Sequence, residues 1–292
     1  MGRKTQEKSM SSFIANKDAF KAICLEINGN ADSSIPQPVL IIGQEGAGKT
    51  ILLQRLSTAY ADLHFVWIDG RSIFSTADIT DKATAASVLI IDDLDYYLER
   101  CTYDEQFRLR RFLYNEGAPM MIASVSKLYP ALTEYKAPFF EGLKKIHLSP
   151  ITEEELSLVF GDRSMGKVMT MFSLVPPTVN SMEIISNVIE SSISSENDLN
   201  LLLSYYSGIY RLKYENVPPT SQHILNALGN SEKGMSLPEI REFSGLTSGV
   251  LSPYLKRLTK EGLILSDKTK SRGTKYAIKD PLFKIWLKNE RQ

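Results

Sequence analysis

The stretch Gly43-Gln44-Glu45-Gly46-Ala47-Gly48-Lys49-Thr50 decides the fold of this 292-residue chain. Its glycines allow backbone N–H groups to turn inward and surround phosphate oxygens. Lys49 can bring a positive charge to the β- and γ-phosphates of a nucleotide, and the Thr50 hydroxyl can bind Mg²⁺. An apolar run at 39–42 predicts a strand before the loop, and the pattern over 49–60 predicts a helix after it. We therefore predict that residues 43–50 bind ATP.

Two carboxylates end a second apolar run, Val88-Leu89-Ile90-Ile91-Asp92-Asp93. A phosphate-binding loop needs an acidic partner on a neighbouring strand to hold its metal ion. We expect Asp92 to hold Mg²⁺ together with Thr50, and Asp93 to polarise the attacking water. Ser124 ends the next predicted strand, where it could hydrogen-bond the water or the γ-phosphate. The predicted catalytic residues are therefore Lys49, Asp93 and Ser124. The alternative for Asp92 and Asp93 is an ordinary acidic end of a strand.

Five continuous apolar runs predict the buried strands of a parallel sheet. They cover residues 39–42, 63–68, 88–91, 120–124 and 145–148, and helical patterns at 49–60, 77–84 and 103–116 separate them. Alternation of this kind implies right-handed crossovers and a three-layer α/β domain. Pro150 ends the pattern, so residues 1–150 are predicted to form a P-loop ATPase core.

The chain changes character beyond Pro150. Residues 151–215 contain helical patterns and no strand, so we expect a helical lid there. Pro218-Pro219 opens a third unit, 216–292, with predicted helices at 221–228, 237–243 and 250–261 and a strand pair at 263–265 and 275–278. This order indicates a winged helix-turn-helix whose wing turns at Gly273. Pro253 lacks an N–H group and is expected to shift the start of its helix.

The charge of the chain is unevenly distributed. Its 34 basic and 34 acidic residues cancel, but residues 216–292 hold 13 basic and 7 acidic residues, whereas residues 1–215 hold 21 and 27. A basic module of this kind favours double-stranded DNA as a partner. The expected DNA contacts lie early in the second helix and in the hairpin: Thr247, Ser248, Ser252, Tyr254, Lys268, Lys270, Arg272 and Lys275. The alternative is a basic face that packs against protein.

The order of these features resembles the AAA+ ATPases, and more narrowly the prokaryotic archaeal-ATPase family, which is close to the STAND ATPases and origin-recognition initiators. Three stretches carry the narrower resemblance: Phe13-Ile14-Ala15-Asn16-Lys17-Asp18, Leu148-Ser149-Pro150 and Asp280-Pro281-Leu282-Phe283-Lys284-Ile285-Trp286. They are similar to a box that lies against the adenine in relatives, to the entry of the lid and to a C-terminal signature. The resemblance implies an AAA+ fold with a lid and a winged helix, ATP and Mg²⁺ as cofactors, and ATP hydrolysis.

Departures from the family pattern concern hydrolysis. Asp93 stands where a catalytic glutamate is common, and its side chain is shorter. Residues 174–178 replace a G-x-P-R pattern, and Gly142-Leu143 replaces a G-R pair, with Lys144 and Lys145 as imperfect substitutes. An arginine finger is worth about 10³–10⁵ in turnover. The resemblance therefore implies slow hydrolysis unless a second copy of the chain or a partner protein supplies the positive charge.

The remaining composition narrows the class of protein. Two cysteines and three histidines give no disulfide framework and no metal-ligand spacing, and no run approaches the ~20 apolar residues of a membrane span. Without a recognisable signal peptide, we expect a cytoplasmic protein with no membrane partner. The leading hypothesis is a nucleotide-dependent switch. The alternatives are a DNA-binding or protein-docking regulator in which ATP is structural, and a small-molecule kinase, against which the winged helix and the large lid argue.

Overall fold

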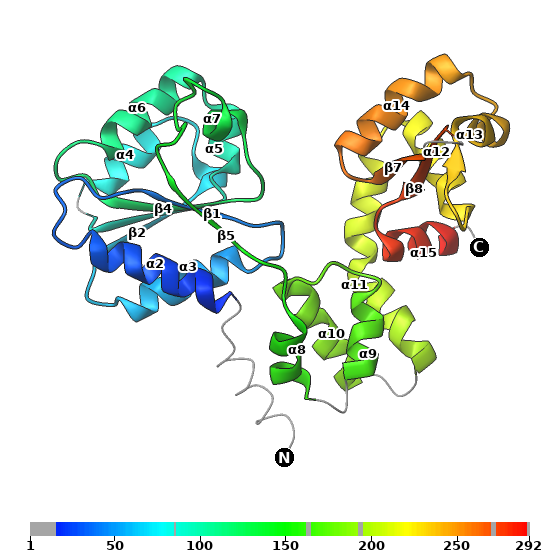
Figure 1. Ribbon diagram of the computed structural model, residues 1–292, viewed down its shortest axis with the longest axis horizontal. Coiled ribbons are helices and arrows are strands. Elements are labelled where there is room, and N and C mark those ends of the chain that lie inside the picture. The colour runs from blue at the N-terminus through cyan, green and yellow to red at the C-terminus, as the bar shows by residue number, and fades with distance from the viewer. Residues whose placement is uncertain (1–15, 85, 162–164, 192–194, 270–272, 291–292) are drawn as a thin grey trace. The chain divides into compact units, whose positions relative to one another are not determined.

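The structure, a computed structural model, describes residues 16–84, 86–161, 165–191, 195–269 and 273–290. The chain forms two compact units. One contains the residues up to Gly161 together with Thr178–Asn180, and the other contains Asp162–Pro177 and Ser181–Gln292. Figure 1 labels the helices and strands of both units.

The first unit is built on a five-stranded parallel sheet with the strand order β2-β3-β4-β1-β5. Its strands are β1 (Val39–Ile42), β2 (Phe65–Asp69), β3 (Val88–Asp92), β4 (Met120–Val125) and β5 (Lys144–His147). β1, β3 and β4 lie in the middle of the sheet and are buried over their whole length. Their position explains why they are continuous apolar runs in the sequence, since helices cover both of their faces.

Helices lie on both faces of the sheet (Figure 1). Val39 and Ile41 face one core, which the helices α2 (Lys17–Gly29) and α3 (Lys49–Ala59) complete. Leu40 and Ile42 face a second core, completed by residues of α4 (Ala77–Ala83), α5 (Asp95–Arg100), α6 (Tyr103–Leu113) and α7 (Pro130–Thr133). Alternate side chains of one strand thus enter different cores. The predicted three-layer α/β architecture is confirmed.

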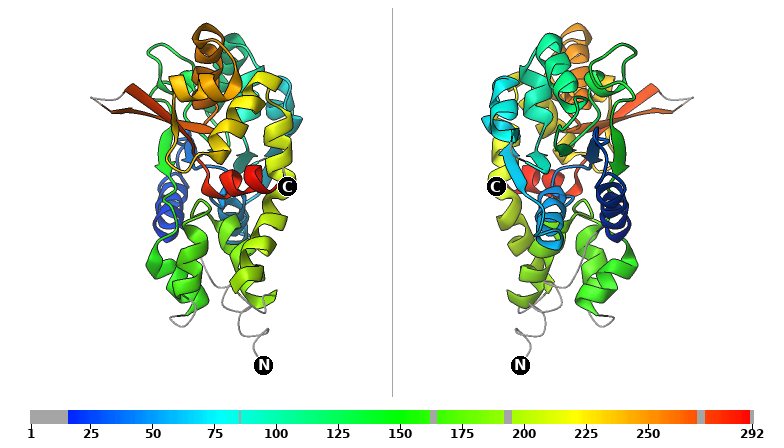
Figure 2. Two further views of the ribbon diagram at one scale, coloured as in Figure 1. Left: turned by 90° about the vertical axis from the view of Figure 1, so that its right-hand side faces the viewer. Right: turned by 90° about the vertical axis from the view of Figure 1, so that its left-hand side faces the viewer.

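The second unit combines helices with a small antiparallel sheet. After α8 (Glu153–Phe160), which belongs to the first unit, come α9 (Met165–Phe172), α10 (Val179–Ser191), α11 (Ser195–Glu215), α12 (Pro219–Asn230), α13 (Leu237–Ser244), α14 (Ser248–Lys260) and α15 (Pro281–Asn289). The strands β6 (Met235–Ser236), β8 (Gly273–Ile278) and β7 (Ile264–Thr269) pair in that order. Figure 2 shows the β7–β8 pair extending away from the helices of its unit. Among the described helices, none is long and apolar enough to cross a membrane.

Two details predicted for this unit are wrong. Gly273 begins β8 instead of lying at the centre of the turn, because β7 and β8 pair over more residues than their apolar pattern indicates. Pro253 does not shift the start of its helix and lies inside α14. The N–H groups of Val250 and Leu251 both bond the Thr247 carbonyl, at 3.1 and 3.0 Å, so the first turn is closed before Pro253 is reached.

Aromatic side chains join α11 to α15 within the second unit. The Tyr210 ring lies 5.1 Å from that of Phe283 and 6.1 Å from that of Trp286. The Tyr210 hydroxyl donates a hydrogen bond to Asp280 Oδ2 at 3.1 Å, and the same carboxylate caps α15 by accepting the Phe283 N–H at 3.0 Å. Trp286 Nε1 donates to Ser207 Oγ at 3.1 Å. Phe283 and Trp286 are thus buried anchors of the C-terminal helix.

Candidate functional site

The predicted phosphate-binding loop connects the carboxyl end of β1 to α3. Gly46 and Gly48 have φ angles of 76° and 90°, a backbone region that glycine adopts at no steric cost. Lys49 is 7% exposed, and its Nζ donates to the carbonyl oxygens of Gly43 at 2.8 Å and Gln44 at 3.3 Å. The backbone curvature and the buried ammonium therefore occur in the same loop, which is what a phosphate group requires.

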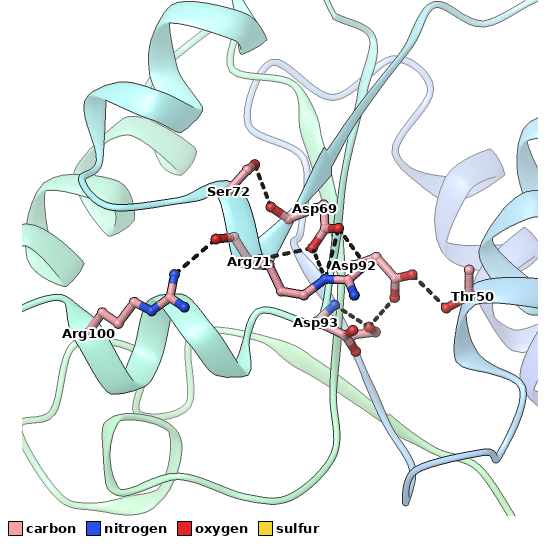
Figure 3. A network of polar contacts seen from close by, with 8 residues as sticks. Thr50, Asp69, Arg71, Ser72, Asp92, Asp93 and Arg100 are labelled. Carbon is pink, nitrogen blue, oxygen red and sulfur yellow. Dashed lines mark hydrogen bonds and ion pairs between the residues drawn. The ribbon is translucent and has the colours of Figure 1, made fainter. Parts of the chain in front are cut away.

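Side chains from three elements meet at the carboxyl end of the sheet, as Figure 3 shows in part. Thr50 Oγ1 donates to Asp92 Oδ2 at 2.6 Å, and Ser124 Oγ donates to Asp92 Oδ1 at 2.6 Å. The Asp93 N–H donates to Ser124 Oγ at 2.9 Å. The structure thus brings together four of the five residues for which the sequence predicts metal binding or catalysis, and the fifth, Lys49, precedes Thr50 in the chain. A hydroxyl and a buried carboxylate side by side are hard oxygen ligands of the kind that Mg²⁺ prefers, so the residues present fit a magnesium nucleotide.

Asp93 is held in an unusual conformation at this edge. Its φ is 57°, in the left-handed region, which a non-glycine residue rarely adopts. A Cβ atom on Gly70, which directly follows β2, would lie 2.0 Å from the Asp93 carbonyl oxygen, so the two backbones are in direct contact. Burial, followed by the charge of Asp92, raises the pKa of the Asp93 carboxyl above its usual 3.8, against a smaller opposing effect of Lys49. A carboxylate with a raised pKa is better suited to accept a proton from water.

A second charged group beside the site was not predicted from the sequence. Asp69, the last residue of β2, pairs with Asp92 in the β2–β3 register and binds Arg71 with an Nη2–Oδ2 distance of 2.6 Å. Hydrogen bonding to Arg71 lowers the pKa of the Asp69 carboxyl. Arg100 of α5 donates from Nη1 to the Arg71 carbonyl at 2.9 Å (Figure 3). The available signal was the position of Asp69 at the carboxyl end of a parallel strand, where ligand-binding groups gather.

The segment Thr178–Asn180 lies against the glycine loop and belongs to the same unit. The Asn180 N–H donates to the Gly46 carbonyl at 3.2 Å, and Val179 Cγ2 lies 2.9 Å from where a Cβ on Gly48 would stand. Thr178 is also the last of the residues 174–178 that stand in place of the family's G-x-P-R pattern. In the structure the start of α10 touches the loop through backbone and apolar atoms.

Asn16 links the loop to the chain that follows β5. Its Oδ1 accepts the Ser149 N–H at 2.9 Å, and its Nδ2 approaches the Ala47 carbonyl at 3.5 Å. Asn16 belongs to the N-terminal box, of which residues 13–15 lie outside the described residues. Two stretches that carry the family resemblance, the box and Leu148-Ser149-Pro150, are therefore joined beside the loop.

Lys144 and Lys145, the possible substitutes for a family arginine, bind groups away from the loop. Lys144 Nζ lies 3.2 Å from Glu26 Oε1 of α2, and Lys145 Nζ donates to the Leu132 carbonyl at 3.0 Å. Each ammonium thus has a partner within the first unit.

The residues predicted to contact DNA are only partly gathered. Thr247 is the N-cap residue of α14, and Ser248, Ser252 and Tyr254 lie within its first seven residues. The Ser252 hydroxyl donates to the Ser248 carbonyl at 2.8 Å. Lys275 is half-buried on β8, opposite Asp267 of β7, and Lys268 lies further along β7 opposite Thr274. The remaining two, Lys270 and Arg272, lie outside the described residues.

Comparison with known proteins bears on the fold. No protein-family model matches the chain, and no curated protein matches its sequence. Among solved structures, the Orc1 protein of Aeropyrum pernix in complex with DNA is similar, with a TM-score of 0.58 and 11% identity over 94% of this chain and 92% of that chain. Two others are the Thermotoga maritima RuvB Holliday junction branch migration motor (TM-score 0.48, 16% identity, 92% of this chain and 94% of that chain) and AMPPCP-bound DnaA from Aquifex aeolicus (0.49, 15%, 86% and 90%).

The likeness to Orc1 concerns the fold alone, because the identity is 11%. Together with the five-stranded parallel sheet, it confirms the predicted AAA+ P-loop NTPase fold. The TM-scores of the RuvB and DnaA structures, 0.48 and 0.49, are too low to support a statement about the fold.

Proposed function

We propose that the chain is a nucleotide-dependent switch of the AAA+ type that binds ATP with Mg²⁺ and hydrolyses it slowly. The observation that carries the proposal is the hydrogen-bonded series Thr50–Asp92–Ser124–Asp93 beside the glycine loop. It joins Thr50 of α3, Asp92 of β3 and Ser124 of β4 to the candidate base, Asp93, which directly follows β3. All four lie at the edge where parallel strands bind ligands.

Each residue of the series has a role that follows from its chemistry. Lys49 exchanges its carbonyl partners for the β- and γ-phosphates, and Thr50 and Asp92 hold the metal ion. Mg²⁺ bound there supplies charge neutralisation at the phosphates. Asp93 accepts the proton of the attacking water, and Ser124 fixes Asp92 and the Asp93 backbone in their relative positions.

Slow hydrolysis is supported by the engagement of Lys144 and Lys145 with groups outside the loop. The missing positive charge would then come from a second copy of the chain or from a partner protein. In that case the specific activity of ATP turnover rises with protein concentration, and a control with Lys49→Ala shows no turnover at any concentration. A fast specific activity that does not depend on concentration contradicts this part of the proposal.

We further propose that residues 216–292 form a winged helix that contacts DNA, after an ATPase core at 1–150 and a lid at 151–215. Support comes from the α13–α14 pair followed by the β7–β8 hairpin, and from the 13 basic and 7 acidic residues of this region. The Aeropyrum pernix Orc1 structure, which shares the fold, contains DNA. Since Lys256 and Arg257 lie late in α14, few side chains are available for base contacts, and phosphate contacts should dominate.

A salt titration tests the DNA proposal. If four to six phosphates are neutralised, the slope of log K against log salt is roughly −4 to −5, with little sequence preference. The triple change Lys268→Ala, Lys270→Ala and Arg272→Ala should flatten this slope by up to ~3 units. The matched control is Lys21→Ala, Lys82→Ala and Arg111→Ala in the first unit, which should leave the slope unchanged. Absence of binding at about 50 mM salt, with and without ATP, assigns the basic face to protein docking instead.

The second candidate is a regulator in which ATP is structural, and the same engagement of Lys144 and Lys145 favours it. ATP turnover with and without saturating DNA separates the candidates. Stimulated turnover supports the switch, and bound ATP that is never hydrolysed supports the regulator. Transfer of phosphate to a metabolite would instead identify a small-molecule kinase.

A further inference from the structure

A cavity of about 260 Å³ lies within the second unit and contains no residue of the proposed nucleotide site. Side chains of α11, α12 and α15 line it, together with Glu290, which directly follows α15. Cavities for drug-sized ligands usually measure ~300–1,000 Å³, so this one suits a ligand of only a few heavy atoms.

The charges that line this cavity are mostly negative. Glu290 Oε1 lies 3.1 Å from Arg211 Nη2, so these two charges offset one another. Among the described residues that line the cavity, the cation is Arg211. Glu215, one turn further along α11, makes no ion pair with the described part of the chain. The cavity therefore has an unbalanced negative charge, which attracts a cation.

Two side-chain amides on α12 add hydrogen-bond acceptors. Gln222 Nε2 donates to the carbonyl oxygens of Tyr214 at 3.0 Å and Val217 at 3.2 Å. Since a carbonyl oxygen only accepts, these contacts fix which way the amide is turned. Asn226, which is 5% exposed, donates from Nδ2 to the Tyr214 hydroxyl at 2.8 Å. Neither amide oxygen accepts a hydrogen bond from the described residues, so both are available to a donor.

Aromatic and apolar groups complete the wall of the cavity. Trp286 and Leu287 of α15 are 5% and 4% exposed, and the Trp286 ring lies 6.0 Å from that of Tyr214. The Trp286 N–H already donates to Ser207 Oγ, so the indole has no free donor for a ligand. An organic cation suits this wall, because aromatic rings attract its charge and its carbon atoms leave water.

We propose that this cavity binds a small primary amine as its ammonium ion. An ammonium group has three N–H donors and no acceptor, which matches two free amide oxygens and one free carboxylate. The same groups repel a phosphate or a carboxylate. The inference goes beyond the proposed function and does not depend on the nucleotide site.

The test is tryptophan fluorescence of the full-length chain carrying Trp67→Phe, in which Trp286 remains as the second of the two tryptophans. At constant ionic strength, pentylamine should change the fluorescence of Trp286 to a saturating value, with a dissociation constant on the order of 1 mM, as expected for so small a ligand. The neutral probe 1-pentanol has the same carbon chain and should bind at least about tenfold more weakly.

Substitutions that change the charge in opposite directions should have opposite effects. Glu215→Gln removes the free carboxylate and should weaken pentylamine binding about tenfold. Arg211→Gln removes the cation and frees Glu290, so pentylamine should bind about three- to tenfold more tightly. The matched control is Glu242→Gln, at an exposed glutamate of α13 outside the cavity, which should leave the affinity unchanged.

A pentylamine titration that does not saturate overturns the proposal, as does equal affinity for pentylamine and 1-pentanol. Equal affinity of Glu215→Gln and Glu242→Gln for pentylamine also overturns it. Nα-acetyl-lysine amide identifies the source of the amine: its binding supports the proposal with a peptide side chain as ligand, and binding of pentylamine alone supports it with a free amine. None of these results bears on ATP binding, so a failure here leaves the proposed function intact.

Discussion

Asp93 combines a left-handed backbone with a carboxyl group that is partly buried beside a second carboxylate. Because its folded-state pKa is raised above 3.8, the native state holds the proton more tightly than the unfolded state does. The free energy of unfolding then falls as the pH rises from 3.8 through the folded-state pKa, and the charged form destabilises the protein at neutral pH. A loss of stability of this kind is common at functional sites.

Asp93→Asn should therefore raise the melting temperature at pH 7 and abolish ATP turnover. Asparagine tolerates the left-handed region and has nearly the same size, but it carries no charge and accepts no proton. Scanning calorimetry at a series of pH values should show the gain shrinking toward acid pH, where Asp93 is protonated. The exposed control Asp81→Asn should change neither property. A lower melting temperature at pH 7, or turnover at the wild-type rate, would contradict this account of Asp93.

Gly70 is a position where no side chain fits. A Cβ atom there would overlap the Asp93 carbonyl group, which is backbone and cannot rotate away. Gly70→Ala should destabilise the first unit by roughly 1–3 kcal/mol and lower turnover by displacing Asp93. The matched control is Gly208→Ala in α11, where nothing lies within 4 Å of the added atom, and this change should stabilise its helix by about 0.5–1 kcal/mol. Denaturant titration measures the free energy of unfolding of both variants. A Gly70→Ala protein as stable as the wild type would exclude the predicted overlap.

At the level of elements, one carboxylate with two partners contributes to the contact between α11 and α15. Asp280 accepts hydrogen bonds from the Tyr210 hydroxyl and from the Phe283 N–H, so the same carboxylate binds α11 and caps α15. Tyr210→Phe should lower the free energy of unfolding by about 1 kcal/mol. Asp280→Ala should lower it further, because the cap of α15 is lost as well. The double variant should lose less free energy of unfolding than the two single variants lose together, by about 0.5 kcal/mol or more. Additive costs would show that the two groups do not interact, and the exposed control Tyr205→Phe should have no effect.

The sequence predicts some elements better than others for physical reasons. The central strands are predictable since burial on both faces requires continuous apolar runs. Helix α5 was missed because six residues are too few to show a helical period, and α2 was missed although Ala19, Ile23 and Ile27 recur every four residues. At the site, Asp92, Asp93 and Ser124 are found from their places at strand ends. The contact of Asn180 with Gly46 joins residues 134 positions apart, and nothing local in the sequence indicates it.

For the whole molecule, the switch proposal depends on where the chain passes between its two units. Thr178–Asn180 belongs to the unit that contains the glycine loop, and the chain enters the other unit at Ser181. Asn180 is hydrogen-bonded to the loop through Gly46, directly before this passage. A nucleotide that moves the loop would therefore act on the residues that lead into the second unit. The loop can act on the second unit in this way only if a nucleotide binds to it.

Nucleotide binding is thus the central claim, and calorimetry with ATP and Mg²⁺ tests it most directly. The wild-type chain should bind ATP at one site, and Lys49→Ala should not bind, because it removes the ammonium that the loop holds at Gly43 and Gln44. Lys82→Ala, at an exposed position on α4, should bind like the wild type. Equal affinity of the wild type and Lys49→Ala would contradict the account.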